Sequence, residues 1–276
     1  MFVFIRLFRS QGHELNLFDI EQKRMERVAK ETGSKAFSSV SEFIGASDTI
    51  VVCTPISVTS NIIDDISRLA EKKINIVEIS SLKNQSVLAL RRNLETIIPV
   101  SVHPMFGPDV ETFEEKTIIV VPVIDQLREQ ELAKELFPGA NLMVLDSETH
   151  DRSMALILSL PYFMNSVFMK CMANKDISLL RKIGGPTFKT QLALAHCILD
   201  EDPFFVESLI EDNVYAGDIL TQYIDELKYL RRMLKSRPNK LVDYYEENRR
   251  VTKTDPESTN ARSLRNLFLQ TQQNEQ

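Results

Sequence analysis

The residues best suited to chemistry form the segment His103-Pro104-Met105-Phe106-Gly107-Pro108, which follows a β-branched run ending at Val102. Pro104 restricts His103 to extended geometry, and Gly107 followed by Pro108 predicts a sharp turn. In an open α/β sheet, ligands bind beyond the carboxyl ends of the strands. Because histidine titrates near neutral pH, His103 at such an end could transfer a proton in a reaction. The alternative is a histidine that only ends a loop.

The elements that would position this histidine alternate between strand and helix, which predicts βαβ units around a parallel sheet. Strands are expected at 14–18, 48–53, 74–79, 97–102, 117–122 and 141–145, and helices at 21–31, 58–70, 85–94 and 126–137. From Thr149 onward only helical patterns remain, at 151–173, 177–183, 188–199, 203–211, 213–234 and 240–251. The sequence therefore predicts a doubly wound α/β dinucleotide-binding domain over 1–148 and an all-α domain over 149–276.

Composition and charge narrow the class of protein. The chain has 276 residues, is 43% hydrophobic and carries a formal net charge of −6, whereas a nucleic-acid binder should present a basic face. Its three cysteines lie far apart and are expected to be buried thiols of a reducing compartment. The apolar run 154–171 is interrupted by polar residues and falls short of the roughly 20 apolar residues of a membrane span. We expect a soluble cytoplasmic protein without a metal, nucleic-acid or membrane partner.

The beginning of the chain departs from a complete dinucleotide-binding unit, which opens with a strand, a G-x-G-x-x-G turn and a helix. Residues 1–11 have the helical spacing expected after that turn, and Gly12 stands where the helix should end. We therefore expect an incomplete Rossmann-like sheet without its first strand and glycine turn. Either Met1 is an internal methionine of a longer chain, or the protein has lost its phosphate-binding turn. Since the first strand is central in this sheet order, we expect two half-sheets with unpaired edges and poor dinucleotide binding.

The other cofactor candidates stand at strand ends. Asp19 ends the second strand of such a unit, where a carboxylate accepts hydrogen bonds from the adenosine ribose and repels a 2′-phosphate, which favours NAD. The alternative is a helix cap, and the nearby Lys23 and Arg24 keep NADP open. Thr54 and Pro55 close the fourth strand, where the chain would pass near the nicotinamide.

With these residues, the chain resembles the prephenate dehydrogenases over nearly its whole length. The resemblance rests on Asp19, on Ser80-Ser81-Leu82-Lys83, on His103-Pro104-Met105-Phe106-Gly107-Pro108, and on residues 148–155 at the start of the helical domain. It implies NAD(P)-linked oxidative decarboxylation of prephenate to 4-hydroxyphenylpyruvate in tyrosine biosynthesis, an active site between the domains, and a homodimer formed through the helices. It also implies that His103 takes the proton of the ring hydroxyl and that Ser81 orients His103 and contacts the substrate. Lys83 would lie beside Ser81 as a further substrate contact.

Two positions depart from the family's pattern. Tyr162 stands where many members have a histidine near the substrate, and Val214 where many have a carboxylate-binding arginine. Tyr162 is equally a hydrogen-bond donor or a core aromatic. Five cations could replace the arginine, some of them from a partner subunit: Arg152, Lys170, Arg181, Lys182 and Lys189. Arogenate is therefore an alternative substrate, and a non-catalytic ligand-binding paralogue is an alternative function.

Two further histidines are expected to be structural. His150 should pack at a helix start capped by Thr149, and His196 should be a core histidine. The helix from Asp151 to Ala173 is apolar nearly all round, which predicts burial on every side and favours an intertwined dimer. Pro161 should kink this helix.

Overall fold

The strand and helix patterns of the sequence are realised in a computed structural model that describes residues 2–236 and 240–255. The chain divides into two units, Met1–Met154 with Glu207–Val214 and Ala155–Val206 with Tyr215–Gln276. The division after Met154 lies beyond the expected boundary between residues 148 and 149, and residues 207–214 join the first unit. The end of the predicted helical domain, 256–276, lies outside the described residues. The assignment of cofactor and substrate binding to separate domains stays a prediction.

The elements of the first unit lie close to their predicted ranges. Its strands are β1 Asn16–Leu17, β2 Lys35–Ala36, β3 Thr49–Val52, β4 Ile74–Glu78, β5 Ile97–Pro104, β6 Thr117–Val120 and β7 Asn141–Val144. Its helices are α1 Phe2–Ser10, α2 Gln22–Thr32, α3 Val40–Gly45, α4 Ile56–Leu69, α5 Asn84–Arg92, α6 Gln126–Leu136 and α7 Ser147–Met154. β2 and α3 are additions, because these two short elements leave no periodic apolar pattern in the sequence.

The sheet is in two pieces, as expected for an incomplete Rossmann-like fold. Among the described residues, β1 pairs only with β2, and the other strands form a five-stranded sheet in the order β3-β4-β5-β6-β7. β3, β4 and β5 run parallel, but β6 is antiparallel to β5, so the prediction of a fully parallel sheet is wrong at this point. A parallel neighbour needs a crossover connection, usually a helix, and residues 105–116 contain no helix. The chain therefore folds straight back from β5 into β6.

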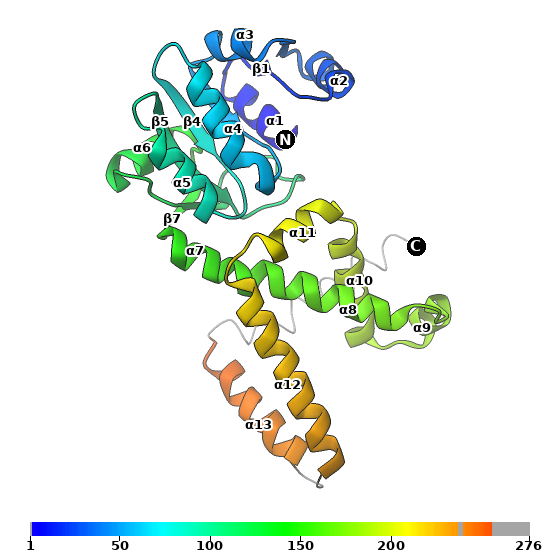
Figure 1. The fold of residues 1–276 in the computed structure, drawn as a ribbon. Helices are drawn as coiled ribbons and strands as arrows, with labels where there is room; N and C mark the ends of the chain where they lie inside the picture. Colours follow the sequence, from blue (N-terminus) through cyan, green and yellow to red (C-terminus); the bar gives the residue numbers. More distant parts are fainter. Residues whose placement is uncertain (1, 237–239, 256–276) are drawn as a thin grey trace. The chain divides into compact units, whose positions relative to one another are not determined.

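Helices cover both faces of the larger sheet. One apolar cluster joins α1 and α6 to the strands, and its buried members include Phe4, Phe8, Val100 and Phe137. The other joins α3, α4 and α5 to the opposite face, as Figure 1 shows for α4 and α5, which lie side by side. Consecutive strand residues divide between the two clusters, because side chains of a strand alternate in direction. The carboxyl ends of β4 and β5 are thus fixed between two packed layers.

The first helix ends as its glycine predicts. Gly12 has a φ of 89°, in the left-handed region that favours glycine. Its backbone N–H donates to the Arg9 carbonyl oxygen at 2.9 Å, and the His13 N–H donates to Phe8 O at 3.2 Å. These bonds satisfy carbonyls at the end of α1 and turn the chain towards β1.

The second unit is helical throughout its described residues. It contains the π-helical segment Ala155–Ser159, then α8 Leu160–Met172, α9 Ile177–Ile183, α10 Pro186–Leu199, the start of α11 Pro203–Glu211, α12 Ala216–Ser236 and α13 Lys240–Lys253. α8 packs against α10, and α12 lies beside α13 (Figure 1). A π turn directly precedes Pro161, because proline interrupts regular α-helical hydrogen bonding, and the kink expected there stays a prediction.

Two expectations of burial are wrong, and the burial of the helix at 151–173 on every side stays a prediction for the dimer. The apolar run that we expect from the sequence to be too short for a membrane span lies within Ser147–Met172, which is long and apolar enough to cross a membrane by length and composition alone. Core helices of soluble proteins share both properties. Within the single chain it is not buried on every side, since it exposes Leu156, Ile157, Met164 and Val167.

Cys171 and Cys197 are exposed, whereas burial raises the pKa of the partly buried Cys53 thiol to about 11. His196 is also exposed rather than part of the core.

Candidate active site

His103 lies inside the carboxyl end of β5 rather than after it. It pairs with Ile119 of the antiparallel β6, and its side chain is only 5% exposed. Ser101, two residues earlier on the same face of β5, faces Glu78 at the end of β4. The Ser101 hydroxyl donates to Glu78 Oε2 at 2.9 Å. Two strand ends thus bring a histidine, a carboxylate and a hydroxyl to one face of the sheet.

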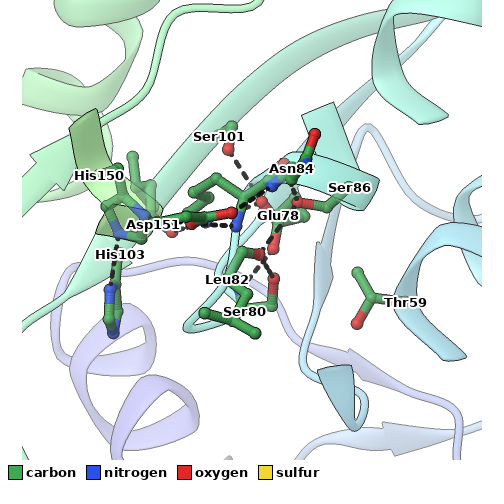
Figure 2. A network of polar contacts seen from close by, with 12 residues as sticks. Thr59, Glu78, Ser80, Leu82, Asn84, Ser86, Ser101, His103, His150 and Asp151 are labelled. Carbon is green, nitrogen blue, oxygen red and sulfur yellow. Dashed lines mark hydrogen bonds and ion pairs between the residues drawn. The ribbon is translucent and has the colours of Figure 1, made fainter. Parts of the chain in front are cut away.

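A row of three polar side chains begins at His103. Its Nδ1 lies 2.9 Å from Nε2 of His150, and Nδ1 of His150 lies 2.7 Å from Oδ1 of Asp151 (Figure 2). All three residues are buried. The expectation that His150 only packs at a helix start is therefore wrong, because both of its ring nitrogens have polar partners.

Helix α7 carries His150 and Asp151, and polar contacts fix its position. Asp146, not Thr149 as expected, caps the helix: its Oδ1 accepts the Thr149 backbone N–H at 2.9 Å and its Oδ2 accepts the Thr149 hydroxyl at 2.6 Å. The Asp151 carbonyl oxygen accepts a bond from the side-chain amide of Asn213 at 2.9 Å. Its carboxylate accepts the backbone N–H groups of Lys83 and Asn84, each at 2.8 Å, at the start of α5.

Lys83 does not project towards a ligand, which corrects its predicted role as a substrate contact. Its Nζ donates to Glu78 Oε2 at 2.8 Å and to the Val102 carbonyl oxygen at 2.6 Å, and the side chain is fully buried. Glu78 also accepts the backbone N–H of Ser80. This ion pair therefore ties the ends of β4 and β5 to the segment before α5.

Burial dominates the electrostatics of the row. It lowers the pKa of His103 well below the usual 6.5, and the positive charge of Lys83 and the proximity of His150 lower it further. Burial also lowers the pKa of His150, against the raising effect of its hydrogen bond to Asp151. Lys83 has a lowered pKa for the same reason, opposed by Glu78. Both histidines are therefore neutral near pH 7, the state in which His103 can accept a proton.

The hydrogen-bond partner of His103 in the structure is His150 rather than the predicted Ser81. Ser81 is half-buried, and in the part of the chain that the structure describes it makes no hydrogen bond with His103, whose Nδ1 is taken by His150. Its neighbour Ser80 donates its hydroxyl to Leu82 O at 2.7 Å. Contact between Ser81 and a substrate stays a prediction.

The predicted cofactor residues lie at the ends of β1 and β3. Asp19 Oδ1 accepts the Glu21 backbone N–H at 2.9 Å in the turn before α2. Glu21, not Asp19, is the N-cap residue of that helix, so the alternative role as a helix cap is not found. Its other carboxylate oxygen has no hydrogen-bond partner among the described residues, which fits the acceptor that a ribose hydroxyl requires. The Thr54 hydroxyl lies 3.0 Å from that of Thr59, and Pro55 directly precedes α4.

Tyr162 belongs to the second unit. Its ring packs edge-on to Phe205, with centroids 6.3 Å apart, and burial raises the pKa of its half-buried hydroxyl. Val214, in the first unit, is 61% exposed. Of the five candidate cations, Arg152 pairs with Glu148 at 2.8 Å, Lys189 is half-buried, and three are exposed: Lys170, Arg181 and Lys182.

Sequence reasoning missed four members of this network. Glu78 and Ser101 are a cross-strand pair whose register cannot be read from one strand, and Asp151 acts on a backbone 67 and 68 residues away. One signal was available for the fourth. His150 directly precedes an aspartate at the start of a helix, and such a carboxylate is a common partner for an imidazole.

The architecture defines a class: a Rossmann-like unit with a buried histidine near a strand end, followed in sequence by a helical unit. The chain matches the family model for the prephenate dehydrogenase nucleotide-binding domain over residues 4–144. It matches the model for the prephenate dehydrogenase dimerization domain over residues 146–247. The chain therefore belongs to the prephenate dehydrogenase family.

Individual relatives are distant in sequence. A probable arogenate/prephenate dehydrogenase of Methanocaldococcus jannaschii is 23% identical over 247 residues, which cover 85% of this chain and 54% of the relative. The T-protein of Haemophilus influenzae is 20% identical over 81% of this chain and 57% of its own length. The chain thus spans about half the length of these curated relatives.

Solved structures share the fold. Prephenate dehydrogenase from Aquifex aeolicus, in complex with hydroxyphenyl propionate and NAD+, superposes with a TM-score of 0.74 at 18% identity, covering 92% of this chain and 94% of that one. Synechocystis arogenate dehydrogenase has a TM-score of 0.65 at 16% identity, covering 92% and 93%.

Proposed function

We propose that this chain catalyses the NAD(P)-dependent oxidative decarboxylation of prephenate to 4-hydroxyphenylpyruvate. The observation that carries the proposal is His103, a buried and neutral imidazole whose Nδ1 is hydrogen-bonded to His150 and whose Nε2 has no partner among the described residues. Such a ring is suited to take the proton of a substrate hydroxyl. Family membership supports the reaction class, and the relatives named above include both prephenate and arogenate dehydrogenases.

Three side chains of this protein would contact the substrate. His103 Nε2 would accept the proton of the ring hydroxyl while Ser81 and Tyr162 contact the substrate. When bound, the nicotinamide supplies the hydride acceptor, and loss of the ring carboxylate as CO2 makes the product aromatic. Because aromatisation drives the reaction, the protein mainly needs to align donor and acceptor and remove one proton.

Asp19, Thr54 and Pro55 are the proposed contacts to the cofactor. An acidic residue at the Asp19 position favours NAD, because it accepts from the ribose hydroxyls and repels a 2′-phosphate. We further propose a cytoplasmic homodimer formed through the helical residues, which is supported by the match to the dimerization domain model.

Arogenate is the alternative substrate. It carries an amino group where prephenate has a keto group, and Val214 stands where the resemblance leads us to expect an arginine for a substrate carboxylate. A changed carboxylate site could accompany a changed substrate. The same departure, together with Tyr162, would also fit a non-catalytic paralogue that binds a ligand without turning it over.

The test measures formation of reduced nicotinamide in the four combinations of prephenate or arogenate with NAD or NADP. It uses the purified protein and a version extended upstream by a strand and a G-x-G-x-x-G turn, because we expect poor dinucleotide binding without that turn. We expect the highest rate from the extended protein with prephenate and NAD. His103→Asn should lower turnover roughly 10²–10⁴-fold, as removal of a general base does. The exposed His13→Asn is the matched control and should leave the rate unchanged. Ligand binding without turnover in all four combinations would favour the non-catalytic paralogue.

A further inference from the structure

The row of residues that starts at His103 ends at the Asp151 carboxylate, which at this position can only accept hydrogen bonds. Both oxygens of Asp151 face backbone N–H groups, Lys83 N at Oδ1 and Asn84 N at Oδ2, each at 2.8 Å. An amide nitrogen in a peptide can donate but not accept. The site at the start of α5 also favours negative charge. Asp151 is therefore a carboxylate whose oxygens present lone pairs to every neighbour.

The Asp151 carboxylate determines which nitrogen of each histidine carries a proton. His150 Nδ1, 2.7 Å from Asp151 Oδ1, must carry a hydrogen to form that bond. A neutral His150 then has only a lone pair on Nε2, and this atom lies 2.9 Å from Nδ1 of His103. Nδ1 of His103 must consequently carry the hydrogen of that contact. The single proton of a neutral His103 is thus on Nδ1.

The remaining nitrogen of His103 is then a free base. Nε2 has no partner within residues 2–236 and 240–255, and Figure 2 shows it on the side of the ring that points away from His150. Among the described residues, it is the one imidazole nitrogen of the row that has no hydrogen-bond partner. A ring with the opposite tautomer would present an N–H there and could not accept a proton.

We propose that His150 and Asp151 are positioning residues that hold His103 in its Nδ1–H tautomer, so that Nε2 is the proton acceptor. This inference rests on the proposed function, which it deepens, and it makes a claim about the protein without substrate. The backbone at the start of α5 makes Asp151 an acceptor, and Asp151 then holds the proton of His150 on Nδ1. His150 in turn holds the proton of His103 on Nδ1, which leaves Nε2 of His103 as a base. Lys83 and Glu78 fix the surrounding strand ends but donate nothing to either imidazole.

The first test reads the tautomer directly. The chain has four histidines, so a sample labelled with nitrogen-15 in histidine and carrying a tag without histidines gives four imidazole spectra. The variants His13→Gln and His196→Gln assign the two exposed rings. We expect His103 and His150 both to show a protonated Nδ1 and an unprotonated Nε2. A wild-type His103 protonated on Nε2 would overturn the proposal, whatever the activity of the protein.

The second test replaces His150 with two residues that differ in whether they can accept a hydrogen bond. His150→Phe keeps an aromatic ring but removes the acceptor, so His103 should populate both tautomers. His150→Gln keeps an acceptor oxygen for Nδ1–H of His103, so the wild-type tautomer should be retained. Backbone amide spectra establish that each variant is folded. An unchanged His103 tautomer in folded His150→Phe would contradict the role of His150.

Steady-state kinetics distinguish a positioning role of His150 from a purely structural role. If the protein turns over substrate, His150→Phe should lower kcat roughly 10–100-fold with little change in KM, the range seen when a supporting hydrogen bond is lost. His150→Gln should restore most of that loss. Equal losses in the two folded variants would indicate a purely structural residue. Absence of turnover in the wild type would count against the proposed function but leave the tautomer result standing on its own.

Discussion

Burial is the largest influence on the charge of His103, and this makes the stability of the fold depend on pH. Its folded-state pKa is depressed below 6.5 by burial, by Lys83 and by His150. Between the two pKa values, His103 is therefore protonated in the unfolded chain but neutral in the folded chain. The stability associated with the neutral ring is fully present above pH 6.5 and is lost as the pH falls below that value.

We expect the urea midpoint of the wild type to fall as the pH is lowered through 6.5, and to fall less in His103→Asn, which has no imidazole at this position. The difference between the two proteins isolates this ring from other acid-sensitive groups. Parallel urea midpoints over the whole range would contradict the depressed pKa of His103. Proton acceptance by His103 should also persist somewhat below pH 6.5, since the ring stays neutral there.

The buried ion pair of Lys83 and Glu78 allows a sharper test of stability. Lys83→Met leaves the Glu78 carboxylate buried without its cation, which costs about 3–5 kcal/mol in comparable cases. Equilibrium urea unfolding should show this loss, and the double variant Lys83→Met/Glu78→Gln should recover part of it. Lys72→Met is the control, because the Lys72–Asp48 pair is exposed and should contribute less than about 1 kcal/mol. Equal effects in the two single variants would refute a structural role for the buried pair.

At the scale of elements, apolar patterns predicted well whatever depends on local sequence. The helix at residues 2–10, its stop at Gly12 and the strand leading to His103 follow from spacing and glycine alone. The direction of β6 and the carboxylate that satisfies the start of α5 depend on which segments meet in space. Neither feature can be deduced from local sequence, and for the same reason the sequence alone predicts only a packing role for His150.

Helix α6 has a buried cap whose removal should be costly. The Glu129 carboxylate accepts the backbone N–H groups of Val123, Ile124 and Asp125 at 2.7, 2.8 and 2.9 Å. Glu129→Ala would remove the acceptor of one buried and two partly buried N–H groups, so we expect a loss of roughly 2–4 kcal/mol in urea unfolding. Glu131→Ala, on the exposed side of the same helix, should change stability by less than about 0.5 kcal/mol. A Glu129→Ala protein as stable as the Glu131→Ala control would show that this cap is not needed.

At the scale of the whole molecule, the proposed dimer would cover apolar side chains that the single chain exposes. Leu156, Ile157, Met164 and Val167 share one helical run and are 38–51% exposed. A charge buried in a subunit interface is strongly unfavourable, so Ile157→Glu should convert a dimer into a monomer. Light scattering over a range of concentrations measures this change. Leu127→Glu, at a position 74% exposed on α6, is the control and should leave the mass unaltered. A wild type that is monomeric at every concentration would rule out the dimer.

The sequestered amine of Lys83 also has a practical consequence. Reagents that acylate lysines need a deprotonated and reachable Nζ, and among the described lysines Lys83 is the only fully buried one. Its modification must wait until the strand ends around it separate, whereas surface lysines react at once. The rate at which Lys83 becomes labelled, followed by mass spectrometry of its peptide, therefore serves as a clock for the opening of the first unit under native conditions.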